Sequence, residues 1–190
     1  MTAGEFLLWP GDGTGRKCQL IDGEVWAMSP ASPRHGFVQA NLSYLLLAAI
    51  EQALLPSRVA TEGAIVPALH AADNVRVPDL VVAVDEGSEG DAMVINEPLA
   101  LVEILSPGNK SLTRDNVRAY ATLPSVREIV VVHISRMEVE VLRRDDTGAW
   151  PADPEVVKPG GFLRLETAGL ECALERVYAR TGLVRRDVVR

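Results

Sequence analysis

The chain lacks the features that mark disulfide-rich, zinc-binding, secreted or membrane-spanning proteins. Its two cysteines, Cys18 and Cys172, stand far apart, and neither has a cysteine or histidine at ligand spacing. Isolated cysteines are typical of free thiols in a reducing compartment, so we expect a cytoplasmic protein. No run of about 18 apolar residues suggests a membrane span. The start of the chain lacks the basic region of a signal peptide.

Positive charge is also scarce. The chain has 19 Lys and Arg against 26 Asp and Glu, which gives a net charge of −7. Nonspecific binding to nucleic acid depends on basic side chains that neutralise phosphates, so this balance argues against strong nonspecific binding. Local basic clusters remain, and they are Lys110, Arg114 and Arg118, then Arg143 and Arg144, then Arg185 and Arg186.

Apolar residues make up 47% of the chain, and the length suits a single domain over residues 1–190. The glycine-rich stretch at 11–17 lacks the spacing of a phosphate-binding loop, so we expect a flexible N-terminal loop there. Period-2 and period-3.6 patterns predict the remaining elements. Strands are expected at 19–29 (a hairpin around Asp22-Gly23), 58–68, 75–84, 99–105, 126–134, 137–144 and 162–165, and helices at 35–55, 112–123 and 173–180.

The order of these elements predicts an α/β fold with a mixed central sheet flanked by helices. The second half of the segment 75–84 is nearly continuous in apolar residues, and 99–105 is largely apolar, which is typical of strands buried on both faces. The segment 137–144 alternates apolar and charged residues, so we expect a half-exposed strand that pairs with the preceding one through a turn at Ser135-Arg136. Residues 145–161 are rich in Asp, Pro and Gly and are expected to be turn and loop.

Two carboxylates interrupt the apolar strands. Asp79 lies in VRVPDLVVAV and Glu103 lies in LALVEIL. Burying a charged carboxylate is costly unless it is paired, and two on adjacent strands would favour a hard divalent cation such as Mg²⁺ or Mn²⁺. Pro78 removes a ladder hydrogen bond beside Asp79 and so opens space there. Alternatively, either acid pairs with an arginine such as Arg76 or Arg118, or lies at a solvated strand end.

Four segments resemble the Uma-type restriction endonucleases (domain of unknown function 820) of the PD-(D/E)XK nuclease superfamily. They are LIDGEVWAMSPASPRHGFVQANL, RVPDLVVAV, ALVEILSPGNK and RDNVRAYATLPSVREIVVV, which lie within residues 19–143. The resemblance implies a restriction-endonuclease-like core with extra strands at both ends. It further implies a magnesium-dependent endonuclease that hydrolyses DNA phosphodiester bonds.

The resemblance also implies roles for particular residues. Asp79 and Glu103 match the metal-binding acids, and the backbone carbonyl of Ile104 often joins such a metal. Glu24 matches a further acid that either binds the metal or orients a water. His35 matches a position that contacts a phosphate or holds a carboxylate, although a local bond at the helix start is an alternative. Tyr120 matches a helix tyrosine with a structural role.

The chain departs from this family pattern at the catalytic lysine. The general motif has lysine two residues after the second acid, on the same face of the strand, and this chain has Leu105 there. Many family members place a lysine four residues before the helix tyrosine, and this chain has Asn116 there. Lys110 is the remaining lysine candidate. Arg114 and Arg118 stay protonated, so they are poor general bases.

Two other functions remain open from the sequence. The first is a catalytically degenerate nuclease fold that acts as a binding or regulatory module. The second is a hydrolase acting on another substrate, although no nucleophile-elbow pattern accompanies the serines near His35 and His133. A homodimer formed through the apolar hairpin strands or through Trp26 and Trp150 would suit cutting of two DNA strands.

Overall fold

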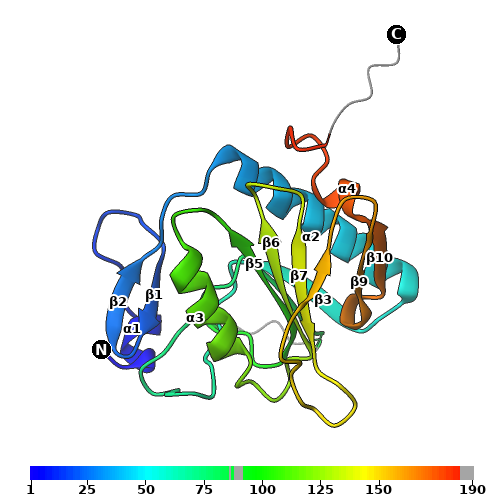
Figure 1. The fold of residues 1–190 in the computed structure, drawn as a ribbon. Helices are drawn as coiled ribbons and strands as arrows, with labels where there is room; N and C mark the ends of the chain where they lie inside the picture. The colour runs from blue at the N-terminus through cyan, green and yellow to red at the C-terminus, as the bar shows by residue number, and fades with distance from the viewer. Residues whose placement is uncertain (86, 88–91, 185–190) are drawn as a thin grey trace.

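The computed structural model describes residues 1–85, 87 and 92–184, and Figure 1 shows its fold. Its centre is a mixed sheet of six strands in the order β3-β4-β5-β6-β7-β8. The strands are β3 (Ser57–Thr61), β4 (Leu80–Val84), β5 (Pro98–Leu105), β6 (Glu128–His133), β7 (Val139–Arg143) and β8 (Glu155–Val157). Within this sheet only β5 and β6 run parallel, and every other neighbouring pair is antiparallel. The predicted α/β fold with a mixed sheet is confirmed.

Alternation along the strands gives the sheet two apolar faces, each covered by a different helix. Val102 of β5 joins the cluster beneath α2 (Pro33–Ala53), whereas Leu101 joins the opposite cluster with Tyr120 of α3 (Lys110–Tyr120). The crossover between the parallel strands β5 and β6 is α3, which lies in front of the sheet in Figure 1. Burial of a Val or Leu side chain contributes about 1.5–3 kcal/mol, so strands that are apolar on both faces are stabilised in this central position.

Helix α2 begins and ends where its sequence provides caps. The Oγ of Ser32 accepts a hydrogen bond of 3.3 Å from the backbone N–H of His35, and Pro33 occupies the first helical position. The helix ends at Ala53, and the C-cap residue Leu54 has a left-handed φ of 52°. This start fixes His35 in the first turn, at the end of the helix that approaches Asp79.

Smaller elements flank the sheet. They are α1 (Ala3–Leu7), the hairpin β1 (Cys18–Ile21) and β2 (Glu24–Ala27), the hairpin β9 (Phe162–Leu165) and β10 (Leu170–Ala173) with the short 3-10 helix η1 (Glu166–Ala168) between its strands, and α4 (Leu174–Val177). An antiparallel bridge between Leu20 and Val75 joins β1 to the segment that leads into β4. The N-terminal hairpin is therefore held close to the start of β4.

Several predicted boundaries are wrong, each for a local reason. The strand expected at 58–68 ends at Thr61, because Glu62 adopts a left-handed φ of 55°. The N-terminal segment contains α1, which a reciprocal capping box between Thr2 and Glu5 stabilises. The segment 145–161, expected to be turn and loop, contains the strand β8. The strand β10 was not predicted. The helix expected at 173–180 is the short α4.

Two parts of the sequence predictions lie outside the described residues. They are the basic pair Arg185-Arg186 and, between the strands expected at 75–84 and 99–105, residues 86 and 88–91. Both cysteines are free thiols, as predicted. Among the helices of the described ranges, none is long and apolar enough to cross a membrane.

Candidate active site

Asp79 lies directly before β4 and is held from three sides. Its Oδ2 accepts a hydrogen bond of 2.6 Å from the backbone N–H of Ile104. Its Oδ1 lies 3.1 Å from Nε2 of His35, and this nitrogen donates when Asp79 is ionised, because a carboxylate oxygen only accepts. The side chain of Gln39 donates to the main-chain oxygen of Asp79 at 3.0 Å. Asp79 is only 7% exposed, so these contacts fix a buried carboxylate.

Glu103 lies within β5 on the sheet face that α3 covers. It is 5% exposed, and its Oε1 accepts hydrogen bonds from Nδ2 of Asn116 at 3.0 Å and from the hydroxyl of Tyr120. Asn116 and Tyr120 are four residues apart, so they share one face of α3. The helix therefore positions Glu103 through two donors.

The register of the sheet brings the two acids together. Leu80 of β4 pairs with Val102 of β5, so Asp79 and Glu103 occupy the next positions on adjacent strands. Burial and the neighbouring Asp79 raise the pKa of Glu103 from 4.5 to about 8, although the donors Tyr120 and Asn116 oppose this rise. The site thus holds two acids whose simultaneous ionisation is unfavourable without a nearby cation.

Neither acid forms the arginine pair considered from the sequence. Arg118 pairs with Asp115 on the surface of α3, at 2.8 Å. The guanidinium of Arg76 donates instead to the amide oxygens of Asn116 at 3.1 Å and Asn74 at 2.9 Å. Among the described residues, no lysine or arginine nitrogen lies within salt-bridge distance of either carboxylate.

Buried polar atoms without a partner concentrate around the two acids. In the described part of the chain they belong to Gln19, His35, Arg76 and Thr113, with Arg144 the remaining case. His35 contacts Asp79, Arg76 contacts Asn116, and Thr113 lies one turn before Asn116 on α3. Buried polar groups are normally satisfied, so this concentration is typical of a site that receives a polar ligand. The hard carboxylate oxygens fit a divalent cation.

The other predicted site residues lie at the periphery. Lys110 is exposed at the first position of α3, and Glu24 is exposed in β2, where it pairs with Ile21. Among the described contacts, none joins Lys110 or Glu24 to Asp79 or Glu103. Leu105 is buried at the end of β5, beside His133 of β6. The structure therefore brings together Asp79, Glu103, Ile104 and His35, and leaves Lys110 and Glu24 outside this cluster.

A second polar cluster lies on the same sheet face, and the sequence did not predict it. His133, Glu138 and Glu140 place three ligand-type atoms within 4.8 Å of one another, the one such group that we find in the described residues. Nε2 of His133 lies 2.7 Å from Glu140, and the guanidinium of Arg114 donates to both oxygens of Glu140 at 2.6 and 2.7 Å. Arg136 pairs with Glu138. Hydrogen bonds from Arg114 and Arg136 are the largest cause of the lowered pKa values of Glu140 and Glu138 respectively.

Glu140 corrects the expectation of a half-exposed β7. It is 7% exposed, because α3 covers this face and supplies Arg114 as its partner. The only sequence signal was an acid alternating with Val139 and Val141, which is equally typical of a solvated strand face.

Trp150 is likewise less available for a dimer surface than expected. Its indole N–H donates to the carbonyl of Ala121 at 2.9 Å, and Arg144 lies over its ring.

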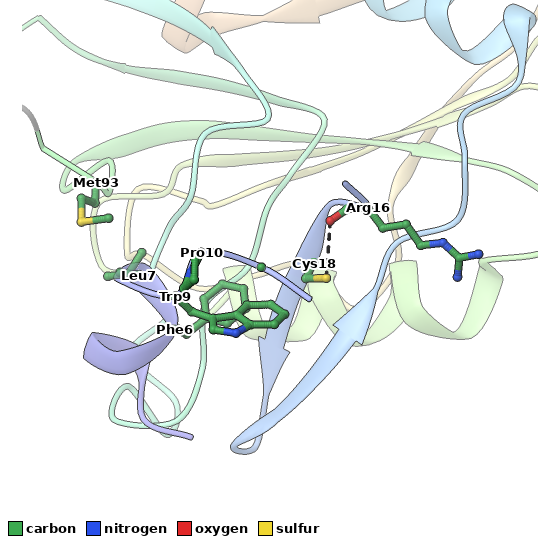
Figure 2. Close-up of a pocket in the computed structure, with 8 residues that line it drawn as sticks. Phe6, Leu7, Trp9, Pro10, Arg16, Cys18 and Met93 are labelled. Carbon is green, nitrogen blue, oxygen red and sulfur yellow. Dashed lines mark hydrogen bonds between the residues drawn. The ribbon is translucent and has the colours of Figure 1, made fainter. Parts of the chain in front are cut away.

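Two surface hollows differ in their position relative to this site. Figure 2 shows a pocket of about 390 Å³ between α1, the following loop and β1, lined by Phe6, Leu7, Trp9, Pro10, Gly11, Arg16, Cys18 and Met93. It contains none of the site residues. A smaller hollow of about 240 Å³ includes Gln39 and Glu62. The side chain of Gln39 and the backbone N–H of Glu62 both donate hydrogen bonds to the main-chain oxygen of Asp79. The second hollow therefore adjoins the site from the side of α2 and β3.

Comparisons with known proteins identify the fold and the family of this chain. A crystal structure described as "a putative nuclease belonging to DUF820" from Anabaena variabilis superposes with a TM-score of 0.74 and 18% identity, covering 94% of this chain and 97% of that one. This likeness shows a shared fold. An uncharacterised protein from Synechocystis sp. is 23% identical over 175 residues, which are 92% of this chain and 89% of that protein. Residues 3–175 match the family model "Uma2: Putative restriction endonuclease", and the chain therefore belongs to the Uma2 family of restriction-endonuclease-like proteins.

Proposed function

We propose that this protein is a metal-dependent endonuclease that hydrolyses phosphodiester bonds of DNA, with its metal held by Asp79 and Glu103. The observation that carries the proposal is the pair of buried acids on adjacent strands, linked through the Ile104 N–H and lacking a lysine or arginine within salt-bridge distance among the described residues. Membership of the Uma2 family supports the nuclease class.

The residues of the site fit a divalent cation. Asp79 and Glu103 supply oxygen ligands of the kind that Mg²⁺ and Mn²⁺ prefer. A cation between them would relieve the repulsion that contributes to the raised pKa of Glu103. The His133 cluster fits a cation less well, because Arg114 and Arg136 already neutralise its carboxylates and would repel an added ion.

The surrounding side chains have defined tasks in this proposal. His35 orients Asp79, while Tyr120 and Asn116 orient Glu103. When bound, the metal supplies a water of lowered pKa and polarises the scissile phosphate. Lys110 is exposed at the start of α3, and its assigned task is to contact the DNA backbone. With a net charge of −7, the protein must contact DNA through such local basic residues.

A degenerate nuclease fold that binds without cleaving is the second candidate. It is favoured by Leu105 and Asn116, which occupy both positions where a lysine was expected. The two functions make different predictions for the same purified protein. Cleavage requires the metal and both acids, whereas a binding module needs neither for DNA binding.

The test is nicking of supercoiled plasmid in Mg²⁺ or Mn²⁺ by the wild type and by Asp79→Ala and Glu103→Ala. The endonuclease requires nicking that depends on the metal and is lost in both variants. Glu51→Gln, an exposed position on α2, is the control and should cleave like the wild type. Metal binding without nicking would support the binding module, and absence of metal binding would reject the site.

A further inference from the structure

Arg76 is a buried cation with no acidic partner in the described part of the chain. It is 5% exposed and lies on the segment that leads into β4, where its backbone pairs with Ile65 through hydrogen bonds of 2.9 Å in both directions. Its guanidinium donates to two neutral amides, Asn116 and Asn74. A buried charge whose hydrogen bonds all go to neutral groups is costly, so its retention needs a reason.

Asn116 connects this cation to the acid pair. Its Oδ1 accepts from Arg76 at 3.1 Å, and its Nδ2 donates to Glu103 at 3.0 Å. The orientation of this amide is fixed by chemistry, because a guanidinium only donates and a carboxylate only accepts. The three groups therefore form a directed chain in which the positive charge of Arg76 polarises the donor that faces Glu103.

The surroundings of Arg76 retain unused hydrogen-bonding capacity. Its Nε has no partner, and neither amide atom of the fully buried Gln19 has one among the described residues. The bridge between Leu20 and Val75 is antiparallel, so Gln19 and Arg76 occupy the next facing positions. The cation is thus held in a polar environment, and only neutral side chains bond its guanidinium.

We propose that Arg76 and Asn116 together take the place of the lysine that this site lacks. Arg76 contributes the fixed positive charge from the segment before β4, and Asn116 contributes the donor to Glu103 from α3. Arg76 is a positioning residue in this arrangement, because it acts on Glu103 through Asn116. The effect of this arrangement on catalysis rests on the proposed nuclease function. Whether position 116 can carry the positive charge in place of position 76 depends on the fold alone.

The first test measures whether the site accommodates one buried cation, which either position 76 or position 116 can carry. Asn116→Lys in the wild-type background puts a second buried positive charge beside Arg76, so we expect a lowered Tm. In the Arg76→Met background the same change supplies the missing cation, so we expect a raised Tm relative to Arg76→Met alone. Thermal unfolding of the four proteins gives the coupling between the two positions.

Equal effects of Asn116→Lys in both backgrounds would overturn the proposal. Arg164→Met, which removes an exposed arginine that pairs with Glu171 on the β9–β10 hairpin, is the charge-matched control. It should leave the effect of Asn116→Lys unchanged. This test requires neither metal nor cleavage, so it decides the proposal even if the wild type does not nick DNA.

The second test measures turnover separately from metal binding. We expect Arg76→Met to lower the nicking rate about 10- to 100-fold, as is typical for residues that support a metal-binding side chain. Calorimetry should show that the variant still binds Mn²⁺, because Asp79 and Glu103 remain. Adding Asn116→Lys should restore most of the lost rate. The proposal would be contradicted if Arg76→Met nicked DNA at the wild-type rate. It would also be contradicted if the double variant bound Mn²⁺ but did not recover the nicking rate.

Discussion

The backbone N–H of Ile104 donates a hydrogen bond of 2.6 Å to the carboxylate of Asp79. This bond ties the Pro-Asp segment to the neighbouring strand immediately after Glu103. Because the donor belongs to the main chain, no substitution at Ile104 other than proline removes it. The separation of the two acids is therefore set by the pairing of β4 and β5, and the site should form before any metal binds.

Metal binding should stabilise the fold through this pair. Mn²⁺ is expected to raise the Tm of the wild type, because an ion that binds only the folded state stabilises it by mass action. Asp79→Asn and Glu103→Gln should abolish the rise, and thermal scanning with and without Mn²⁺ measures it. Glu51→Gln should keep it. A rise that survives in both site variants would place the ion elsewhere, with the His133 cluster the first position to examine.

Glu103 should make the metal-free protein less stable as the pH rises. Its pKa is about 8 in the folded protein against the usual 4.5, so the folded state binds the proton more tightly than the unfolded state between these values. Stability from this group is therefore lost as the pH rises through that window. Glu103→Gln keeps an oxygen acceptor and carries no charge, so its Tm should exceed that of the wild type by more at about pH 8 than at about pH 5. Unfolding in EDTA at both pH values measures this, and an equal difference at both would contradict the assignment.

Tyr120→Phe should weaken metal binding while the fold is retained. The hydroxyl of this fully buried residue donates to Glu103, and its loss removes a donor that favours the ionised carboxylate. We expect Mn²⁺ affinity, measured by calorimetry, to fall about 10-fold or more. Tyr44, which is 67% exposed on α2, offers the matched control Tyr44→Phe, with unchanged affinity expected. Unchanged affinity in Tyr120→Phe would show that Glu103 is positioned without it.

The pair of Arg114 and Glu140 should contribute to stability by tying α3 to β7. Among the described residues, Arg114→Ala leaves the buried Glu140 with His133 as its remaining partner, at a cost of about 1–2 kcal/mol once screening of the partly exposed arginine is allowed for. Arg118→Ala, in an exposed pair with Asp115, should cost less than about 0.5 kcal/mol.

Urea unfolding measures both of these variants. Since Arg114 lowers the pKa of Glu140, its contribution is present above the unfolded pKa of that carboxyl and is lost as the pH falls through the lowered value. Equal costs in stability for Arg114→Ala and Arg118→Ala would show that the buried Glu140 does not depend on its arginine more than an exposed acid does.

The sequence by itself determined the central strands and the acid pair. The apolar runs around Asp79 and Glu103 could be stable only as buried strands, and a carboxylate inside each run required a partner. The segments around the two acids also carried the family resemblance. Local signals failed at short elements, because the four-residue β10 and the three-residue β8 are stabilised by their pairing partners more than by their own patterns.

Only the tertiary structure decided which side chains serve the two acids. Arg76 and Asn116 are 40 residues apart, and Arg114 and Glu140 are 26 apart, so no spacing in the sequence relates them. The crossover α3 brings both contacts together because it must cover the apolar face of the strands that it connects. Its register over the sheet, which depends on side-chain packing along the whole helix, places Asn116 at Glu103 and Arg114 at Glu140. The sequence shows that neither position 105 nor position 116 is a lysine, and the packing of α3 places Asn116 between Arg76 and Glu103.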